Sequence, residues 1–276
     1  MPIKRSFCLL ALLLVGALSD LQAAMPGLSY SDQLPVPQHA LLIDTRATDV
    51  CHKNTLAHAL CLSAESLMTP AQRIPSLRAI AWLLGTYGLQ GDEAVIVIGT
   101  EASQRDFVAG LLYLSGQENV LILSVPVGQL LARASTVKSA GKVRGQSRSA
   151  IYSAAPRDQQ ILLRDELWGL IQNPQQPLLL LDARTDAEYW GHHIRAARGG
   201  HIPGASLWGQ SSDLDMALIE RAVTVIYAHD PVDTIAAFTR LQAGRQDAVR
   251  VYIEGWRSWA AQGVLPADAE SFKQEG

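Results

Sequence analysis

The sequence predicts an α/β fold in two similar units, each a parallel sheet flanked by helices. Short, continuous apolar runs at residues 223–228 and 249–253 have the character of buried strands. A stretch with helical spacing of apolar residues lies between them, so strand, helix and strand follow within about 30 residues. A similar order occurs about 130 residues earlier in the chain. These observations indicate βαβ units and an internal duplication.

The second unit is organised around the turn at residues 228–233, which joins a strand to a helix. Asp230 is predicted to cap that helix, with Pro231 at its first position, and Gly244 ends it. In parallel sheets, ligands bind beyond the carboxyl ends of the strands. Any site in this unit is therefore expected at the turn.

The first unit repeats this order of elements less regularly. Its residues 94–98, 107–114 and 120–123 correspond to the strand, the helix and the second strand around the turn. Two earlier strands, at residues 40–43 and 178–181, end in Asp44-Thr45-Arg46 and Asp182-Ala183-Arg184. Gly99 then occupies in the first unit the position that Ala228 occupies in the second.

The chain is expected to have four parts. Residues 1–24 are a signal peptide, 25–134 the first unit, 135–150 a linker and 151–276 the second unit. Residues 25–38 read as a lead-in, and the polar, basic linker is typical of a solvated connection. Helical periodicity over residues 160–171 leads into the second unit.

The N-terminus has the pattern of a secretory signal. Lys4 and Arg5 precede an apolar run at residues 8–18, and small residues follow up to Ala24. The alternative, a retained transmembrane helix, requires a longer apolar run. We therefore expect an exported protein, periplasmic if the source is bacterial, without membrane attachment after cleavage.

Export would leave two cysteines in the mature chain, Cys51 and Cys61, and an even pair in an oxidising compartment predicts a disulfide. Redox exchange by this pair is a weaker alternative, because the spacing is not Cys-x-x-Cys. The net charge of −3 gives no reason to expect a nucleic acid partner.

Several motifs of the second unit resemble the rhodanese family of sulfurtransferases. They are Asp182-Ala183-Arg184, Glu188-Tyr189, the string from Arg198 to Ala205 (RGGHIPGA), and Glu254-Gly255-Trp256 with Trp259 three residues on. The resemblance covers nearly all of the chain after the signal peptide and implies two tandem rhodanese-like domains. In the first, the sequence at residues 55–59 and 125–128 departs from the family's pattern.

The family places a nucleophilic cysteine at the position of Ala228. A persulfide enzyme needs a thiolate there, held by backbone N–H groups and a helix N-terminus. Ala228 supplies no nucleophile, Pro231 has no N–H, and Asp230 and Asp233 bring negative charge. The degenerate turn comprises Ala228, His229, Asp230, Pro231, Val232 and Asp233.

The second unit also contains candidate residues for an anion site and for a metal site. Arg184 and Arg198 could form an anion site, although Arg184 could instead pair with Asp186, Glu188 or a backbone carbonyl. A metal site would have to draw on the histidines, but no cysteine or carboxylate stands at ligand spacing. The candidate histidines are His192, His193, His201 and His229. We expect no metal and no cofactor, and we expect Trp256 and Trp259 in the core.

Two functions remain open from the sequence. The first is an exported tandem rhodanese-like protein without sulfurtransferase activity, which binds a protein or a small sulfur-containing ligand. The alternative is a sulfurtransferase of the thiosulfate or 3-mercaptopyruvate type, or a related enzyme, that uses a residue other than cysteine. Arg184, His229 and the two cysteines would then be the residues to test.

Overall fold

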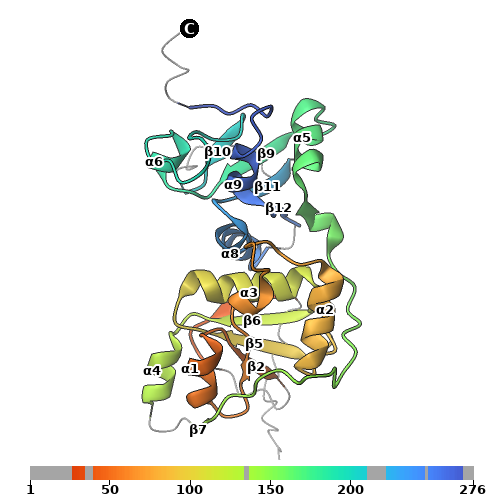
Figure 1. Cartoon of the computed structure of the whole chain (residues 1–276), viewed down its shortest axis with the longest axis vertical. Coiled ribbons are helices and arrows are strands. Elements are labelled where there is room, and N and C mark those ends of the chain that lie inside the picture. Colours follow the sequence, from red (N-terminus) through yellow and green to blue (C-terminus); the bar gives the residue numbers. More distant parts are fainter. Residues whose placement is uncertain (1–26, 35–39, 134–136, 210–221, 246–247, 270–276) are drawn as a thin grey trace, which may run out of the picture.

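The computed structural model describes residues 27–34, 40–133, 137–209, 222–245 and 248–269. In this part the chain forms two five-stranded sheets whose paired strands all run parallel. The predicted α/β fold is therefore confirmed. Figure 1 shows the two units one above the other along the long axis, with α3 and α8 between their sheets.

The two sheets have corresponding strand orders. The first runs β1-β6-β5-β2-β4 and the second, read from its other side, β8-β12-β11-β9-β10. The first sheet consists of β1 (Gly27–Ser31), β2 (Leu41–Asp44), β4 (Leu60–Cys61), β5 (Ala94–Ile98) and β6 (Asn119–Leu123). The second consists of β8 (Ile161–Leu162), β9 (Leu178–Asp182), β10 (Ala205–Leu207), β11 (Val223–Tyr227) and β12 (Arg250–Tyr252).

Helices cover these sheets. In the first unit they are α1 (Thr48–Lys53), the 3-10 turn η1 (Glu65–Leu67), α2 (Leu77–Thr86), α3 (Ala102–Leu114) and α4 (Val127–Ala132). In the second they are the 3-10 turn η2 (Asp158–Gln160), α5 (Arg164–Gln172), α6 (Asp186–Tyr189), α8 (Pro231–Gln242) and α9 (Gly255–Ala260). A small antiparallel pair joins β3 (Thr55–Leu56) and β7 (Lys138–Ser139).

The central strands are apolar at consecutive positions because both of their faces are buried. In β5, Val95 and Val97 pack on the α3 side, whereas Ile96 and Ile98 pack with α4 on the other face. In β11, Ile226 joins the core on the α8 side, and the neighbouring tyrosine Tyr227 packs with Trp256 and Trp259 on the far side. The prediction that both tryptophans are core residues is confirmed.

A single apolar core connects the two units through α3 and α8. It contains Phe107 and Leu111 of α3 and Ile235 and Phe238 of α8, together with side chains from both sheets. The Thr239 hydroxyl donates to the Asp106 carbonyl across this contact at 2.9 Å. The two units are thus packed together.

Two local predictions are wrong. The lead-in at residues 25–38 contains an edge strand, β1, which pairs with β6. The helix expected over residues 160–171 begins only at Arg164, because Ile161 and Leu162 instead pair with β12 at the edge of the second sheet. Both strands are short and lie at sheet edges. They are recognised by their backbone pairing, because neither has the apolar pattern of a buried strand.

The linker is anchored to the first unit. Its side chains are mostly exposed, as predicted, but the N–H of Lys142 donates to the Ala59 carbonyl and the N–H of Cys61 donates to the carbonyl of Lys142. The N–H groups of Ser149 and Ala150 both donate to the Gly85 carbonyl. The linker therefore follows the surface of the first unit from β7 towards α5 (Figure 1).

Cys51 and Cys61 form the predicted disulfide, with their Cα atoms 5.6 Å apart. Cys51 lies within α1, and Cys61 ends β4. The linker residue Gly141 covers the two sulfur atoms, since a Cβ there would lie 2.4 Å from the Cys61 sulfur. Both cysteines are fully buried.

No described helix is long and apolar enough to cross a membrane. The predicted signal peptide, residues 1–24, lies outside the described residues, so it stays a prediction.

Candidate functional site

The carboxyl ends of β9 and β11 lie side by side, because Asp182 pairs in register with Tyr227. The Asp182 carboxylate accepts three hydrogen bonds from the Arg184 guanidinium and one from the Tyr227 hydroxyl, at 2.6–3.2 Å. All three side chains are buried. Asp44 and Arg46 repeat this ion pair at the end of β2 in the first unit, at 2.6 Å. The Asp-x-Arg motif therefore stabilises a strand end in each unit.

Backbone hydrogen bonds from the start of α9 fix the turn after β11. The N–H of Trp256 donates to the Ala228 carbonyl at 2.8 Å, and that of Arg257 to the His229 carbonyl at 2.9 Å. Gly255 has a φ of +68°, and a Cβ on it would lie 2.9–3.0 Å from the backbone of the turn. The Glu-Gly-Trp motif thus needs its glycine for this close backbone approach.

Three backbone N–H groups of the turn, those of Ala228, Val232 and Asp233, donate to side chains at the start of α8. The Asp230 carboxylate accepts from the N–H groups of Val232 and Asp233 at 3.0 and 3.1 Å, as the predicted helix cap requires. The Ala228 N–H donates to the Thr234 hydroxyl at 3.0 Å. Pro231 has no N–H to offer. A bound anion would therefore have to displace the cap of α8.

A cavity of about 210 Å³ opens in front of the turn. Its floor includes three small side chains, Ala183, Ala228 and Ala236, and Ser103 of α3 brings the first unit into its wall. The remaining lining residues are Arg184, Thr185, Glu188, Arg195, His229, Asp233 and Arg240. A hollow lined by several charged residues thus lies at the carboxyl edge of the second sheet, where the sequence analysis expected any site of this unit.

Glu188 is placed in this wall by the first turn of α6. Thr185 and Glu188 form a reciprocal cap: the Thr185 hydroxyl accepts from the Glu188 N–H, and the Glu188 carboxylate accepts from the Thr185 N–H. Burial alone would raise the pKa of Glu188, but hydrogen bonds to its carboxylate from the Thr185 hydroxyl and N–H, with the charges of Arg195 and Arg184, outweigh burial and hold the pKa below its ordinary value. Glu188 is therefore ionised, and its Oε1 atom forms an ion pair with Nη1 of Arg195 at 3.1 Å.

His229 is a buried imidazole at this cavity, with 5% of the residue exposed. Its Nδ1 atom has no hydrogen-bond partner among the described residues and lies 3.7 Å from the nearest Glu188 oxygen. Burial lowers the pKa of His229, and the charge of Arg195 lowers it further. At neutral pH the ring is therefore uncharged, with one nitrogen able to accept a hydrogen bond.

Asp233 presents the second carboxyl group of the cavity from the first turn of α8. Burial raises its pKa, and the neighbouring charge of Asp230 raises it further. The guanidinium groups of Arg195 and Arg240 bring positive charge to the same cavity, and each of these side chains is 43% exposed. Arg240 lies 3.6 Å from Asp106 of the first unit.

The two arginines predicted as an anion site have other partners in the structure. Arg184 pairs with Asp182, which was not among its expected partners, and it also donates to a backbone carbonyl, as expected, that of Gly200 at 2.8 Å. Arg198 donates to the Gln262 and Leu265 carbonyls at 3.1 and 2.6 Å. Nothing in these contacts brings Arg198 to the turn. An anion site made by this pair has no support from their contacts.

The four candidate histidines do not form a cluster that could bind a metal ion. His201 is buried under the Tyr189 ring, and its Nδ1 atom lies 2.9 Å from the Tyr189 carbonyl oxygen. His192 and His193 are exposed beyond α6, whereas His229 lies at the cavity. Among the described residues no group of three metal-ligating side chains is placed to hold an ion.

The sequence interpretation missed Arg195, Arg240 and Ser103 as site residues, and it considered Glu188 only as a partner for Arg184. Arg195 follows α6 in an irregular loop, and Ser103 belongs to the other unit. No local pattern indicates either position. Glu188 could have been found from its capping-box spacing with Thr185, which places its carboxylate at the first turn of a helix beyond β9.

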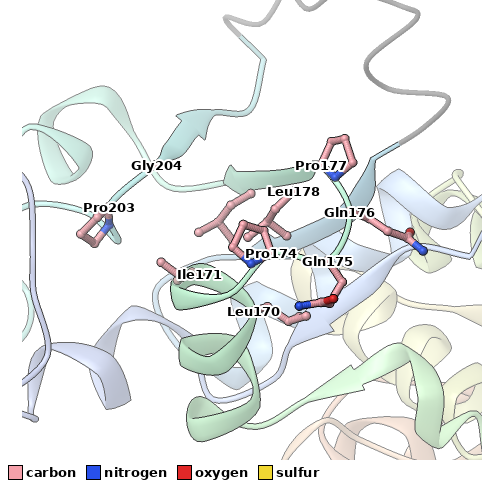
Figure 2. A pocket seen from close by; sticks show the side chains of 10 residues that line it. Leu170, Ile171, Pro174, Gln175, Gln176, Pro177, Leu178, Pro203 and Gly204 are labelled. Carbon is pink, nitrogen blue, oxygen red and sulfur yellow. The ribbon is translucent and has the colours of Figure 1, made fainter.

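Two larger hollows lie elsewhere in the described part. Figure 2 shows one of about 480 Å³ around Pro174, Pro177 and Leu178, where α5 ends and β9 begins. It borders the starts of β9 and β10, at the edge of the sheet opposite the turn. Another, of about 540 Å³, lies beyond the end of β12 beside Arg257. Neither is lined by His229, but the second reaches Pro231 of the turn.

Residues 163–262 match the family described as "Rhodanese-like domain". No curated protein matches the chain. Similar solved structures include wild-type EanB, with 18% identity and a TM-score of 0.67 over 86% of this chain and 65% of that one. Another is the anaerobic ergothioneine biosynthesis enzyme from Chlorobium limicola in complex with trimethyl histidine, with 18% identity and a TM-score of 0.68 over 86% of this chain and 66% of that one.

At this identity the likeness to solved structures establishes the fold. The chain spans about two thirds of the length of these structures. The family match includes β9, β11, the turn and α9, which form most of the cavity's surroundings. Residues 163–262 are therefore a rhodanese-like domain.

Proposed function

We propose that this protein is a rhodanese-like binding protein without sulfurtransferase activity. The observation that carries the proposal is Ala228, a methyl side chain that is 2% exposed at the end of β11, in the position where the family's resemblance places its cysteine. A persulfide needs a sulfur nucleophile at this point. The described residues that line the cavity contain no cysteine.

The rest of the turn supports the same proposal. The N–H groups that would stabilise a thiolate are used by Asp230 and Thr234, and Asp233 adds a carboxyl group to the cavity. A negatively charged donor such as thiosulfate would meet this carboxyl group and would find three N–H groups of the turn already bonded. We also propose that the first unit is a degenerate rhodanese-like domain, which its corresponding strand order supports.

The alternative is sulfur transfer at a residue other than cysteine. Sulfur chemistry occurs in some of the similar structures, but there it is on a cysteine: one is of EanB with a cysteine persulfide in a tetrahedral intermediate state with ergothioneine, at 17% identity and a TM-score of 0.67 over 86% of this chain and 67% of that one. In this chain His229 is the buried group at the turn that such an enzyme would use. An imidazole cannot form a persulfide, so the binding function is the better supported of the two.

We propose further that the protein is exported, and periplasmic if its source is bacterial. The signal-like pattern at residues 1–24 supports this location. The buried Cys51–Cys61 disulfide supports it independently, because such bonds persist in oxidising compartments. Its partner is then a ligand or protein of that compartment.

The test is a sulfur-transfer assay on the purified chain, with thiosulfate or 3-mercaptopyruvate as donor and cyanide as acceptor. A sulfurtransferase of this fold, assayed beside it, controls for the reagents. We expect no turnover above the rate without protein. Turnover that survives Cys51→Ala with Cys61→Ala but is lost in His229→Gln would replace the binding function with the alternative enzyme.

A further inference from the structure

The cavity at the turn is lined by two polar groups, on His229 and Asp233, that lack a close partner in the described part of the chain. The His229 Nδ1 atom is buried and makes no hydrogen bond. Buried polar atoms without a partner are uncommon, and they are often satisfied by a ligand. Asp233 adds a carboxyl group that forms no ion pair in the described part of the chain at 4.0 Å or less. Two acceptors therefore face the same small hollow.

Donor groups lie around the same hollow. Arg195 gives one nitrogen to Glu188, and Arg240 approaches Asp106 with one nitrogen, but each guanidinium has five N–H groups. Both side chains are 43% exposed, so the remaining N–H groups are accessible. These groups are suited to a carboxylate, which an arginine can bind through two parallel hydrogen bonds.

The size and the floor of the cavity limit the ligand. Its volume of about 210 Å³ is below the roughly 300–1,000 Å³ of sites for drug-sized molecules. The three alanine methyl groups of the floor, from Ala183, Ala228 and Ala236, offer no hydrogen bond. A ligand of a few heavy atoms with a short apolar part fits both features.

From this arrangement we infer that the cavity binds a small zwitterion of the amino-acid type. Its ammonium group donates to Asp233 and to Nδ1 of His229, and its carboxylate accepts from Arg195 and Arg240. An anion alone would leave Asp233 and His229 without a donor, and a cation alone would leave the two guanidinium groups facing solvent. The inference rests on the proposed binding function and names the ligand class of the same site.

The experiment measures binding directly, so it is independent of sulfur transfer. The twenty common L-amino acids are titrated one by one into the full chain by calorimetry at pH 7. We expect heat of binding from at least one small member, and much weaker binding of the amine and the acid that lack one of its two charged groups. No binding by any of the twenty would overturn the inference, whatever the sulfur-transfer assay gives.

Variants then assign the two ends of the ligand. Asp233→Asn and Arg195→Gln should each weaken binding about tenfold or more, since each removes a charge-assisted hydrogen bond. The matched controls are Asp92→Asn and Arg133→Gln, two exposed positions outside the cavity, which should leave binding unchanged. Circular dichroism of each variant confirms folding. Equal binding by the folded Asp233→Asn or Arg195→Gln variant would contradict the assignment, as would full affinity for the amine alone.

Discussion

Ala228 and its neighbours determine what the turn can do at the scale of single residues. Asp230 caps α8 with two hydrogen bonds, which stabilises the helix and at the same time fills the place of an anion. The same side chain therefore supports the fold and opposes sulfur chemistry. The sequence predicted this role because Asp-Pro before an apolar helical pattern is a strong N-terminal signal.

Ala228→Cys should restore little sulfur transfer. The new thiol would lie near Asp230 and Asp233, and negative charge there raises the pKa of a thiol. The N–H groups of Val232 and Asp233 would still donate to Asp230, so they could not stabilise the thiolate. Thiosulfate-to-cyanide transfer should remain at least about tenfold below that of a variant that also carries Asp230→Ser, Pro231→Gly and Asp233→Thr. Equal activity of the two folded variants would show that the acidic turn is no obstacle.

Asp233→Asn should stabilise the fold at neutral pH. Because burial raises the pKa of Asp233, the folded state favours the protonated carboxyl group. The resulting stability is present below the unfolded pKa of about 3.9 and is lost as the pH rises through the raised folded value. The neutral amide avoids that loss, so we expect a gain of about 0.5–1 kcal/mol at pH 7.

Urea unfolding of wild type and Asp233→Asn at pH 7 and pH 3.5 measures this effect. The gain should be present at pH 7 and absent at pH 3.5, while Asp92→Asn should change little at either pH. A gain of equal size at both values would show that the carboxylate charge is not its cause.

At the scale of elements, the strands buried on both faces were predictable, because β5, β9 and β11 are continuous apolar runs. The edge strands were not. β1 reads Gly-Leu-Ser-Tyr-Ser, and β8 has only Ile161 and Leu162, so their pairing depends on neighbours distant in sequence. The same holds for the candidate site. Its turn could be predicted from local sequence, whereas Arg195 and Ser103 could not, because only the tertiary fold brings them to the cavity.

Gly110→Ala should disturb the contact between α3 and α8. A Cβ at Gly110 would lie 2.0 Å from the Thr239 hydroxyl oxygen and 2.8 Å from Cγ2 of Ile235. Overpacking of this kind costs about 1–3 kcal/mol of unfolding free energy. Gly169→Ala in α5 is the control, because its Cβ would meet nothing within 4 Å and alanine favours a helix. Thermal unfolding that is unchanged in Gly110→Ala would contradict the tight packing of these helices.

At the scale of the whole molecule, the two units form one packed body. The apolar core passes from one sheet to the other through α3 and α8, and the linker is bonded along the first unit. The cavity depends on this arrangement, since Ser103 and the partner of Arg240 belong to the first unit. The internal duplication was visible in the sequence, but the contact between its halves was not, because no pattern in either half specifies it.

The disulfide is the covalent constraint on the first unit. Replacing Cys51 and Cys61 together by alanine should reduce its stability by about 2–3 kcal/mol, the chain-entropy value for a loop this short. Chemical unfolding with the wild type and the double variant measures the difference. The control is thiol titration of the wild-type chain from an oxidising compartment, in the presence of denaturant. Two free thiols there, or equal stability of the variant, would contradict a structural disulfide.

The central claim is that the turn carries no sulfur. The most direct measurement is intact-mass analysis of the purified mature chain after incubation with excess thiosulfate or polysulfide, without reductant. We predict an unchanged mass for the wild type, because Ala228 has no nucleophile and the Cys51–Cys61 pair is oxidised and buried. The same treatment of a sulfurtransferase of this fold should add the mass of a sulfur atom. A sulfur adduct on the wild-type chain, mapped to residues 228–233, would contradict the account.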